Sequence, residues 1–109
     1  MGNRVSVSFI NNDEESVTLF NHWGGKEFAD FAVKYVKDLR RRVKDSKISD
    51  PIARLEPNTV MVDFIRAITS GISLVRDTLY LGKDDKDGDN SDAGHWVIDV
   101  IKAKAKQRK

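Results

Sequence analysis

The chain of 109 residues has no cysteine, only two prolines and two histidines, and no long run of apolar residues. The absence of cysteine excludes disulfides, a thiolate nucleophile and zinc sites with cysteine ligands. Because no apolar run approaches about 18 residues, we expect no transmembrane helix and no membrane partner. The first residues lead directly into an alternating pattern and not into a signal-peptide block, so we expect a cytoplasmic location.

The charge of the chain is unevenly distributed. Charged residues make up 33% and hydrophobic residues 39%, which is typical of a single globular domain of this length. The net charge is +2, but five bases lie in the last eight residues, and the rest of the chain carries −3. We therefore expect one domain over residues 1–101 and a basic, flexible tail over residues 102–109.

The first half of the sequence predicts a hairpin followed by a long helix. Residues 4–10 alternate between apolar and polar, which indicates a strand with one buried face. Residues 11–15 are polar turn formers, and residues 16–20 read as the returning strand. After Gly24 and Gly25, apolar residues at helical spacing form one stripe over residues 28–43.

The second half adds a helix and further strands. We expect the long helix to end at residues 45–49, followed by a cap at Asp50 and Pro51 and a short turn at residues 52–55. A second helix should run from Pro57 to Gly71. After it we expect one or two strands at residues 72–81, an acidic loop at residues 82–94 and a last strand at residues 95–101. The order β-β-α-α-β-β predicts an α+β fold, with a mostly antiparallel sheet and two main helices packed on one face. An apolar sheet face left uncovered by only two helices would favour a symmetric homodimer.

The acidic loop is the first candidate site. Asp85, Asp87 and Asp89 alternate as the oxygen ligands of calcium often do, but the EF-hand pattern fails at its sixth and twelfth positions. One interpretation is a looser calcium or magnesium site formed by Asp85, Asp87, Asp89 and Asp92. The other is a solvated acidic turn that needs no cofactor.

Two His-Trp pairs form the second candidate. His22-Trp23 and His95-Trp96 contain every histidine and tryptophan of the chain. Two imidazoles without a third ligand make a poor metal site, whereas tryptophan is a common core or interface residue. We therefore assign Trp23 and Trp96 a structural or partner-binding role. Because the chain shows no nucleophile elbow, phosphate loop or dinucleotide motif, we do not expect an enzyme.

Basic residues form the third candidate, as a nucleic-acid surface. Its members are Arg40, Arg41, Arg42, Lys104, Lys106 and Arg108. Consecutive residues of a helix point about 100° apart, so the three arginines spread around the helix. Few aromatic side chains lie outside the apolar stripe, so no stacking platform is evident. Direct nucleic-acid binding is therefore a less favoured alternative to a protein partner.

Several short segments resemble a small family of phage and prophage proteins of unknown function. The matching segments are Gly2-Asn3-Arg4 before a strand, Leu19-Phe20-x-His22-Trp23-x-Gly25 before a helix, Asp50-Pro51 with Ala53-Arg54-Leu55, Asp89-Asn90-x-Asp92-x-Gly94, and Val97-Ile98-Asp99. The chain departs from this family at Phe20, where tyrosine is usual, and in its long basic tail. The resemblance implies an accessory gene of a mobile element, acting in the cytoplasm of a host cell, and implies no activity.

The hypothesis that we favour from sequence is a non-enzymatic protein that binds a host or viral protein complex. The contact surface would be formed by the acidic residues Asp85, Asp87, Asp89 and Asp92 together with Trp23 and Trp96. The acidic loop would imitate nucleic-acid phosphates and inhibit a nucleic-acid-targeting defence complex, in the manner of an anti-CRISPR protein. The metal-binding loop and the nucleic-acid surface described above remain the alternatives.

Overall fold

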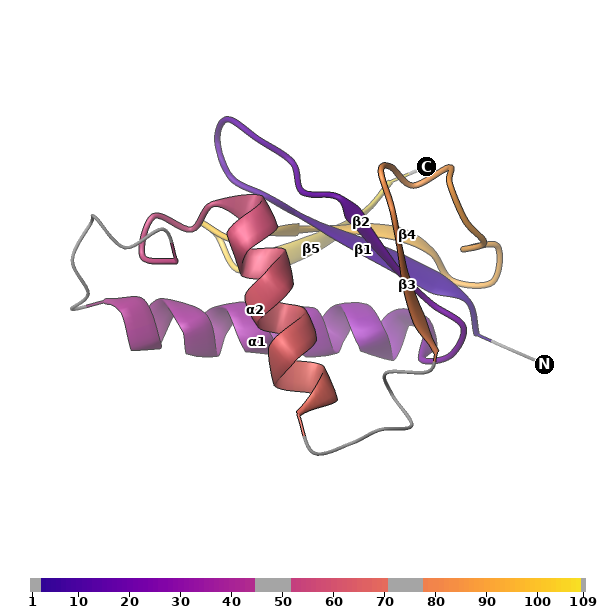
Figure 1. Cartoon of the computed structure of the whole chain (residues 1–109), viewed down its shortest axis with the longest axis horizontal. Helices are drawn as coiled ribbons and strands as arrows, with labels where there is room; N and C mark the ends of the chain where they lie inside the picture. The colour runs from indigo at the N-terminus through magenta and orange to yellow at the C-terminus, as the bar shows by residue number, and fades with distance from the viewer. Residues whose placement is uncertain (1–2, 45–51, 71–77, 109) are drawn as a thin grey trace.

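The computed structural model describes residues 3–44, 52–70 and 78–108. Its elements in chain order are β1 (Val5–Ile10), β2 (Thr18–Asn21), α1 (Gly25–Val43), α2 (Pro57–Thr69), β3 (Leu79–Gly82), β4 (Gly94–Asp99) and β5 (Lys104–Arg108) (Figure 1). The expected α+β class is confirmed. Four expected features lie outside the described residues. They are the helix end at residues 45–49, the cap at Asp50 and Pro51, the helix stop at Gly71 and most of the strand at residues 72–81.

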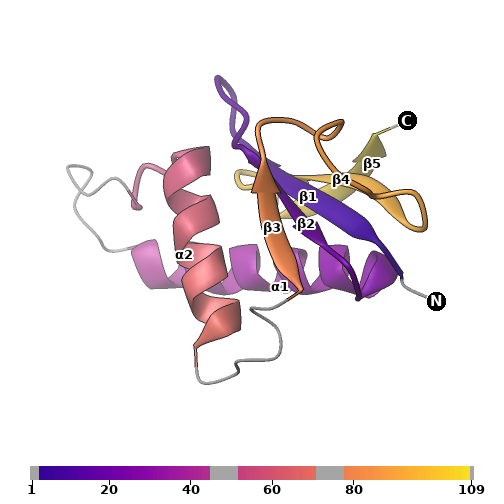
Figure 2. The same cartoon turned by 45° about the vertical axis from the view of Figure 1, so that its right-hand side comes forward.

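The five strands form one sheet in the order β3-β2-β1-β4-β5, and both helices lie on the same side of it (Figure 2). Three of the pairings are antiparallel, as expected, but the central pair of β1 and β4 is parallel. The expectation of a mostly antiparallel sheet is therefore confirmed for three of the four pairings, and the parallel central pair makes the sheet mixed. The reason is the path of residues 83–93, which return the chain to the end of the sheet where β1 begins. There the amide of Ala93 donates to the carbonyl of Arg4 at 2.8 Å, so β4 enters in the same direction as β1.

The hairpin and the long helix form where the sequence predicted them. The side-chain oxygen of Asn11 accepts the amides of Asp13 and Glu14, both at 2.8 Å, which closes the turn between β1 and β2. Gly24 has a φ of 120°, a conformation that side chains other than glycine rarely adopt, and α1 begins directly after it. The His-Trp-Gly-Gly segment is thus the turn that redirects the chain from β2 into α1.

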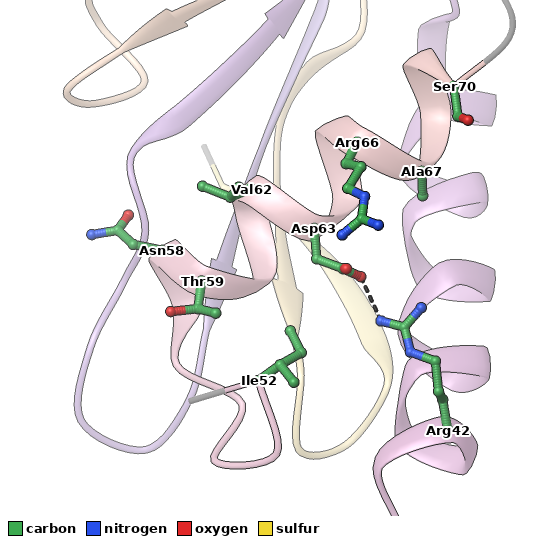
Figure 3. Close-up of a pocket in the computed structure, with 9 residues that line it drawn as sticks. All are labelled: Arg42, Ile52, Asn58, Thr59, Val62, Asp63, Arg66, Ala67 and Ser70. Atoms are coloured by element: carbon green, nitrogen blue, oxygen red, sulfur yellow. Dashed lines mark hydrogen bonds and ion pairs between the residues drawn. The ribbon is translucent and has the colours of Figure 1, made fainter. Parts of the chain in front are cut away.

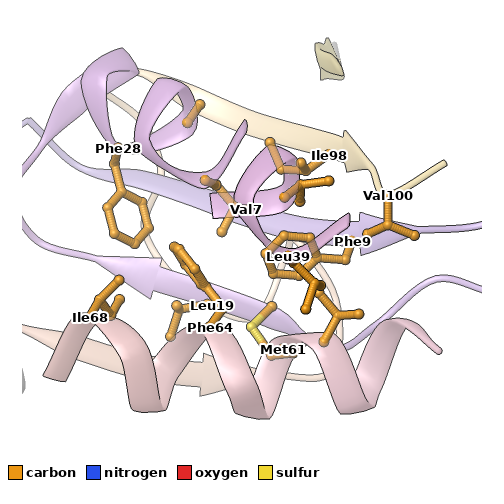
Figure 4. Packing of buried hydrophobic residues seen from close by; sticks show 14 of the residues in the cluster. Val7, Phe9, Leu19, Phe28, Leu39, Met61, Phe64, Ile68, Ile98 and Val100 are labelled. Carbon is orange, nitrogen blue, oxygen red and sulfur yellow. The ribbon is translucent and has the colours of Figure 1, made fainter. Parts of the chain in front are cut away.

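The hydrophobic core lies between the sheet and the two helices (Figure 4). Alternate residues of β1, namely Val5, Val7 and Phe9, meet the apolar stripes of α1 and α2. Phe64 of α2 sits at the centre, where its ring lies 5.3 Å from that of Phe9. The predicted stripe of α1 is confirmed for most of its length, although its member Phe31 is 49% exposed.

The opposite face of the sheet is polar at its centre and is also buried, which the sequence did not predict. Ser6 and Ser8 of β1 are fully buried on this face, together with His95 of β4. Residues 83–93 cover part of it, since an added Cβ at Gly88 would lie 2.6 Å from the ring of Tyr80. The homodimer was expected because an uncovered apolar sheet face would need a partner. Neither face of the described sheet is such a surface, and the dimer stays a prediction.

The basic residues expected as a flexible tail form a turn and an edge strand. β5 pairs with β4 from His95↔Arg108 to Asp99↔Lys104. The turn before it is closed by Asp99, whose carboxylate accepts the amides of Ile101 and Lys102 at 2.8 and 2.9 Å. Residues 102–108 are therefore part of the domain and not a separate segment.

Candidate functional site

The carboxylates of the acidic loop are fixed by hydrogen bonds within the loop and to the start of β1. Asp87 accepts the amide of Lys83 at 2.7 Å, and Asp92 accepts the amide of Arg4 at 3.0 Å. Asp89 forms an ion pair with Arg4 at 3.2 Å. Because these bonds go mostly to backbone amides, the side chains of Asp87, Asp89 and Asp92 are held in place while they remain exposed.

Asp85 differs from the other predicted loop residues. Its side chain is only 18% exposed and lies 3.7 Å from the guanidinium of Arg108. No group of three or more histidine, aspartate or glutamate side chains within residues 3–44, 52–70 and 78–108 is arranged to hold a metal ion. The four predicted ligands Asp85, Asp87, Asp89 and Asp92 therefore do not converge in this structure, and the calcium or magnesium alternative receives no support from the geometry.

The two His-Trp pairs are separated and have different surroundings. His22 and Trp23 lie at the exposed turn before α1, where Trp23 is 53% exposed. His95 is only 3% exposed, and Trp96 is partly buried against the core. Of the predicted partner-binding tryptophans, Trp23 thus has the open surface, whereas Trp96 offers only part of its ring.

His95 is the centre of a chain of hydrogen bonds on the polar face of the sheet. Its Nδ1 lies 2.7 Å from the hydroxyl of Ser6, and its Nε2 lies 3.0 Å from the hydroxyl of Ser8. Ser8 donates to Glu15 at 2.7 Å, so its oxygen is free to accept from Nε2–H, and Nδ1 accepts from Ser6. Asn90 completes the chain by donating to Ser6 at 2.9 Å.

This network shifts the pKa values of His95 and Glu15. Burial lowers the pKa of His95, although the nearby carboxylates of Asp85 and Glu15 oppose that effect. Partial burial raises the pKa of Glu15, but hydrogen bonds from Arg108 and Ser8 outweigh it and hold this pKa below its ordinary value. Because both serine hydroxyls are fully buried, neither is placed to attack a substrate in this conformation. The network holds β1, β4 and β5 together.

The predicted arginines are mostly engaged in ion pairs. Arg41 pairs with Asp38 at 2.7 Å on α1. Arg42 reaches from α1 to Asp63 of α2 at 2.6 Å, at the edge of a hollow of about 860 Å³ (Figure 3). Burial raises the pKa of Asp63, but hydrogen bonds from Tyr35 and Arg42 outweigh it and lower this pKa. Arg42 therefore joins the two helices and is not a free cation.

Lysines of α1 and β5 gather along one edge of the molecule. We call the following five residues the basic edge: Lys34, Lys37, Lys102, Lys104 and Lys106. None of them forms an ion pair with a carboxylate of the described residues. They line two hollows that share Lys104, one of about 570 Å³ between α1 and β5 and one of about 710 Å³ on the other face of β5.

The residues predicted from sequence to bind nucleic acid thus differ in whether their charges are exposed or paired. Lys104 and Lys106 are exposed on β5, as is Arg40 on α1. Arg108 instead donates to Glu15 at 2.9 Å and belongs to the network around His95. Lys34 and Lys37 of α1 were not among the residues predicted from the sequence to bind nucleic acid. Their spacing of three residues puts them on one face of α1, but only the packing of α1 against β5 brings them beside Lys104.

Comparison with models of known protein families, with curated proteins and with solved structures found no match for the chain. Within the part of the chain that the structure describes, neither helix has the length and apolar character needed to cross a membrane.

Proposed function

We propose that the chain binds the sugar–phosphate backbone of nucleic acid through the basic edge. The observation that carries this proposal is the gathering of five lysines from α1, β5 and the turn before β5 around two adjoining hollows, with no ion pair to any carboxylate of the described residues. Lysines that neutralise phosphates release condensed counterions, which drives sequence-independent binding. The sequence favoured a protein partner, and the placement of these lysines is what moves nucleic acid ahead of it.

The geometry of β5 suits a repeating anion. Lys104 and Lys106 are two residues apart on one strand, so they project on the same face about 6.7 Å from each other. Two cations at a fixed separation can contact two phosphates of one strand at the same time. Ordered pairing with β4 fixes this separation, whereas a flexible tail would not.

Replacement of single lysines tests the proposal. Lys104→Gln and Lys106→Gln should each weaken binding to a fluorescein-labelled oligonucleotide about fivefold at about 0.1 M salt, since each removes one phosphate contact. Fluorescence anisotropy measures the affinity. The matched control is Lys83→Gln, which removes the same charge directly after β3 at the opposite edge of the sheet. Equal losses for all three variants would show that only net charge matters and would contradict a site at the basic edge.

Binding to a protein complex through the acidic loop is a second candidate. Asp84, Asp87, Asp89 and Asp92 are exposed, and hydrogen bonds with backbone amides fix three of them directly in the loop turns: Asp84, Asp87 and Asp89. A rigid set of carboxylates supports imitation of phosphates, and the resemblance to phage proteins suggests a defence complex of the host as the target.

Neutralising the loop separates the two candidates. In Asp84→Asn/Asp87→Asn/Asp92→Asn, each amide retains an oxygen that accepts the backbone bond, so the fold is preserved while three charges are removed. If the loop is the contact surface, this variant should lose a partner that wild-type protein retains from nuclease-treated host lysate. If the basic edge is the contact surface, the variant should bind the labelled oligonucleotide at least as tightly as wild type.

A further inference from the structure

The hollow between α1 and β5 contains one aromatic side chain that the proposed backbone contacts do not use. Trp96 lines this hollow together with Lys26, Lys34, Lys37 and Lys104. A groove that combines basic side chains with an aromatic face is the usual arrangement for binding single-stranded nucleic acid, because every base can stack on such a face.

The indole of Trp96 is held in a fixed orientation. Its Nε1 donates to the carbonyl of Ala93 at 2.9 Å, and its ring packs against the core on the side of Val7 and Ile98. The small side chains of Ala103, just before β5, and Ala105, on β5, border the same hollow and leave space beside the ring. A rigid ring next to open space loses little conformational freedom when a planar group stacks on it.

An exposed cation covers the ring in the free protein. The ammonium of Lys26 lies 5.6 Å from the centre of the Trp96 ring. The side chain of Lys26 is 62% exposed and also pairs with Asp30 at 3.2 Å. A surface lysine of this kind is readily displaced from the ring, and its ion pair with Asp30 on the same helix does not depend on the ring.

We infer that the hollow takes an unpaired base, stacked on Trp96, while Lys34 and Lys37 hold the adjoining phosphates and Lys104 lies at the border of the hollow. The ligand class is therefore single-stranded nucleic acid and not duplex, because the bases of a duplex are already stacked and paired. A volume of about 570 Å³ lies within the range of about 300–1,000 Å³ found for small-ligand sites. This inference rests on the proposed function, since it names the form of nucleic acid that the basic edge binds.

Tryptophan fluorescence gives the direct test. The chain has two tryptophans, so Trp23→Phe leaves Trp96 as the single emitter. In this variant, oligo(dT) should quench the emission of Trp96, whereas inorganic polyphosphate, which offers charge without bases, should bind without that quenching. Trp96→Leu should lower the affinity for oligo(dT) about five- to a hundredfold and leave the affinity for polyphosphate unchanged. Trp23→Leu is the matched control and should change neither affinity.

The possible results distinguish the two proposals. Binding of oligo(dT) without quenching of Trp96, with equal affinity for duplex DNA, would overturn the stacking inference and leave the basic edge as a backbone site. No binding to oligo(dT) or to polyphosphate would overturn the proposed function and the inference together. Because Trp96 also packs against the core, circular dichroism of Trp96→Leu is needed, and Trp96→Phe, which keeps an aromatic face, should retain part of the affinity.

Discussion

His95 is the side chain on which the polar face of the sheet depends. Both ring nitrogens are hydrogen-bonded to serine hydroxyls, and Glu15 and Arg108 lie at the far end of the same chain of bonds. The neutral ring satisfies this arrangement, with one nitrogen donating and the other accepting. A second proton would convert Nδ1 from an acceptor into a donor. Ser6 could then accept from Nδ1–H only if its hydroxyl stopped donating to Nδ1.

This protonation makes the stability of the fold depend on pH. Because burial holds the pKa of His95 below its ordinary value of 6.5, the unfolded state takes up the proton first as pH falls. The free energy of unfolding should therefore decrease between pH 6.5 and the folded pKa, with a slope of at most about 1.4 kcal/mol per pH unit. Glu15 affects the free energy of unfolding at lower pH. Because its folded-state pKa lies below the ordinary value of 4.5, its stabilising effect is present above pH 4.5 and is lost as the pH falls further. Urea unfolding across this range measures both effects.

Two histidine variants provide the comparison for this pH dependence. His95→Gln retains a donor and an acceptor but cannot titrate, so the slope just below pH 6.5 should flatten. His22→Gln changes the exposed histidine at the turn before α1 and should leave the slope as it is. A slope that His95→Gln does not alter would contradict the assignment of the pH dependence to this network.

At the scale of elements, β5 is the clearest difference between sequence and structure. Lysines alternate with small or polar residues in this segment, which reads as solvated chain because no apolar face is present. Such a strand forms because β4 offers an open edge, and because Asp99 and Arg108 fix its two ends. Lysines on an edge strand also prevent pairing with other sheets, so the same charges protect this edge.

Hydrogen exchange measures whether β5 is ordered in solution. An edge strand has one row of amides bonded to its neighbour and one row facing solvent. Every second amide of residues 104–108 should therefore exchange more slowly than in an unstructured peptide. Asp99→Ala removes the acceptor that closes the turn and should reduce this protection. Uniformly fast exchange over residues 104–108 of the wild-type chain would show that the segment is a tail.

The elements that the sequence predicted well are those set by local patterns. Three such patterns are the alternation of β1, the apolar stripe of α1 and the proline at the start of α2. Each depends only on residues that are close together in the sequence. The parallel pairing of β1 with β4 depends on where a long connection returns, which no local pattern encodes. For the candidate site, the composition pointed to Lys104 and Lys106, but Lys34 and Trp96 joined them only through the packing of α1 against β5.

At the scale of the whole molecule, the position of the acidic loop limits where a polyanion can bind. The basic edge lies at β5, whereas the acidic loop follows β3 at the other edge before it crosses the polar face. The loop then returns to β4, where Asp85 lies 3.7 Å from the guanidinium of Arg108 on β5. A polyanion is therefore expected along Lys104 and Lys106, and not at Arg108, whose charge is paired with Glu15 and Asp85.

The salt dependence of binding tests the central proposal most directly. Anisotropy of labelled oligo(dT) between about 0.05 and 0.2 M salt should give a straight line of log affinity against log salt, with a slope of about −2 to −3. Lys104→Gln/Lys106→Gln should make this slope shallower by about 1.4, because two phosphate contacts are lost. Lys83→Gln should leave it unchanged. No binding at the lowest salt, or the same slope in the double variant as in wild type, would contradict the proposal that the basic edge binds nucleic acid.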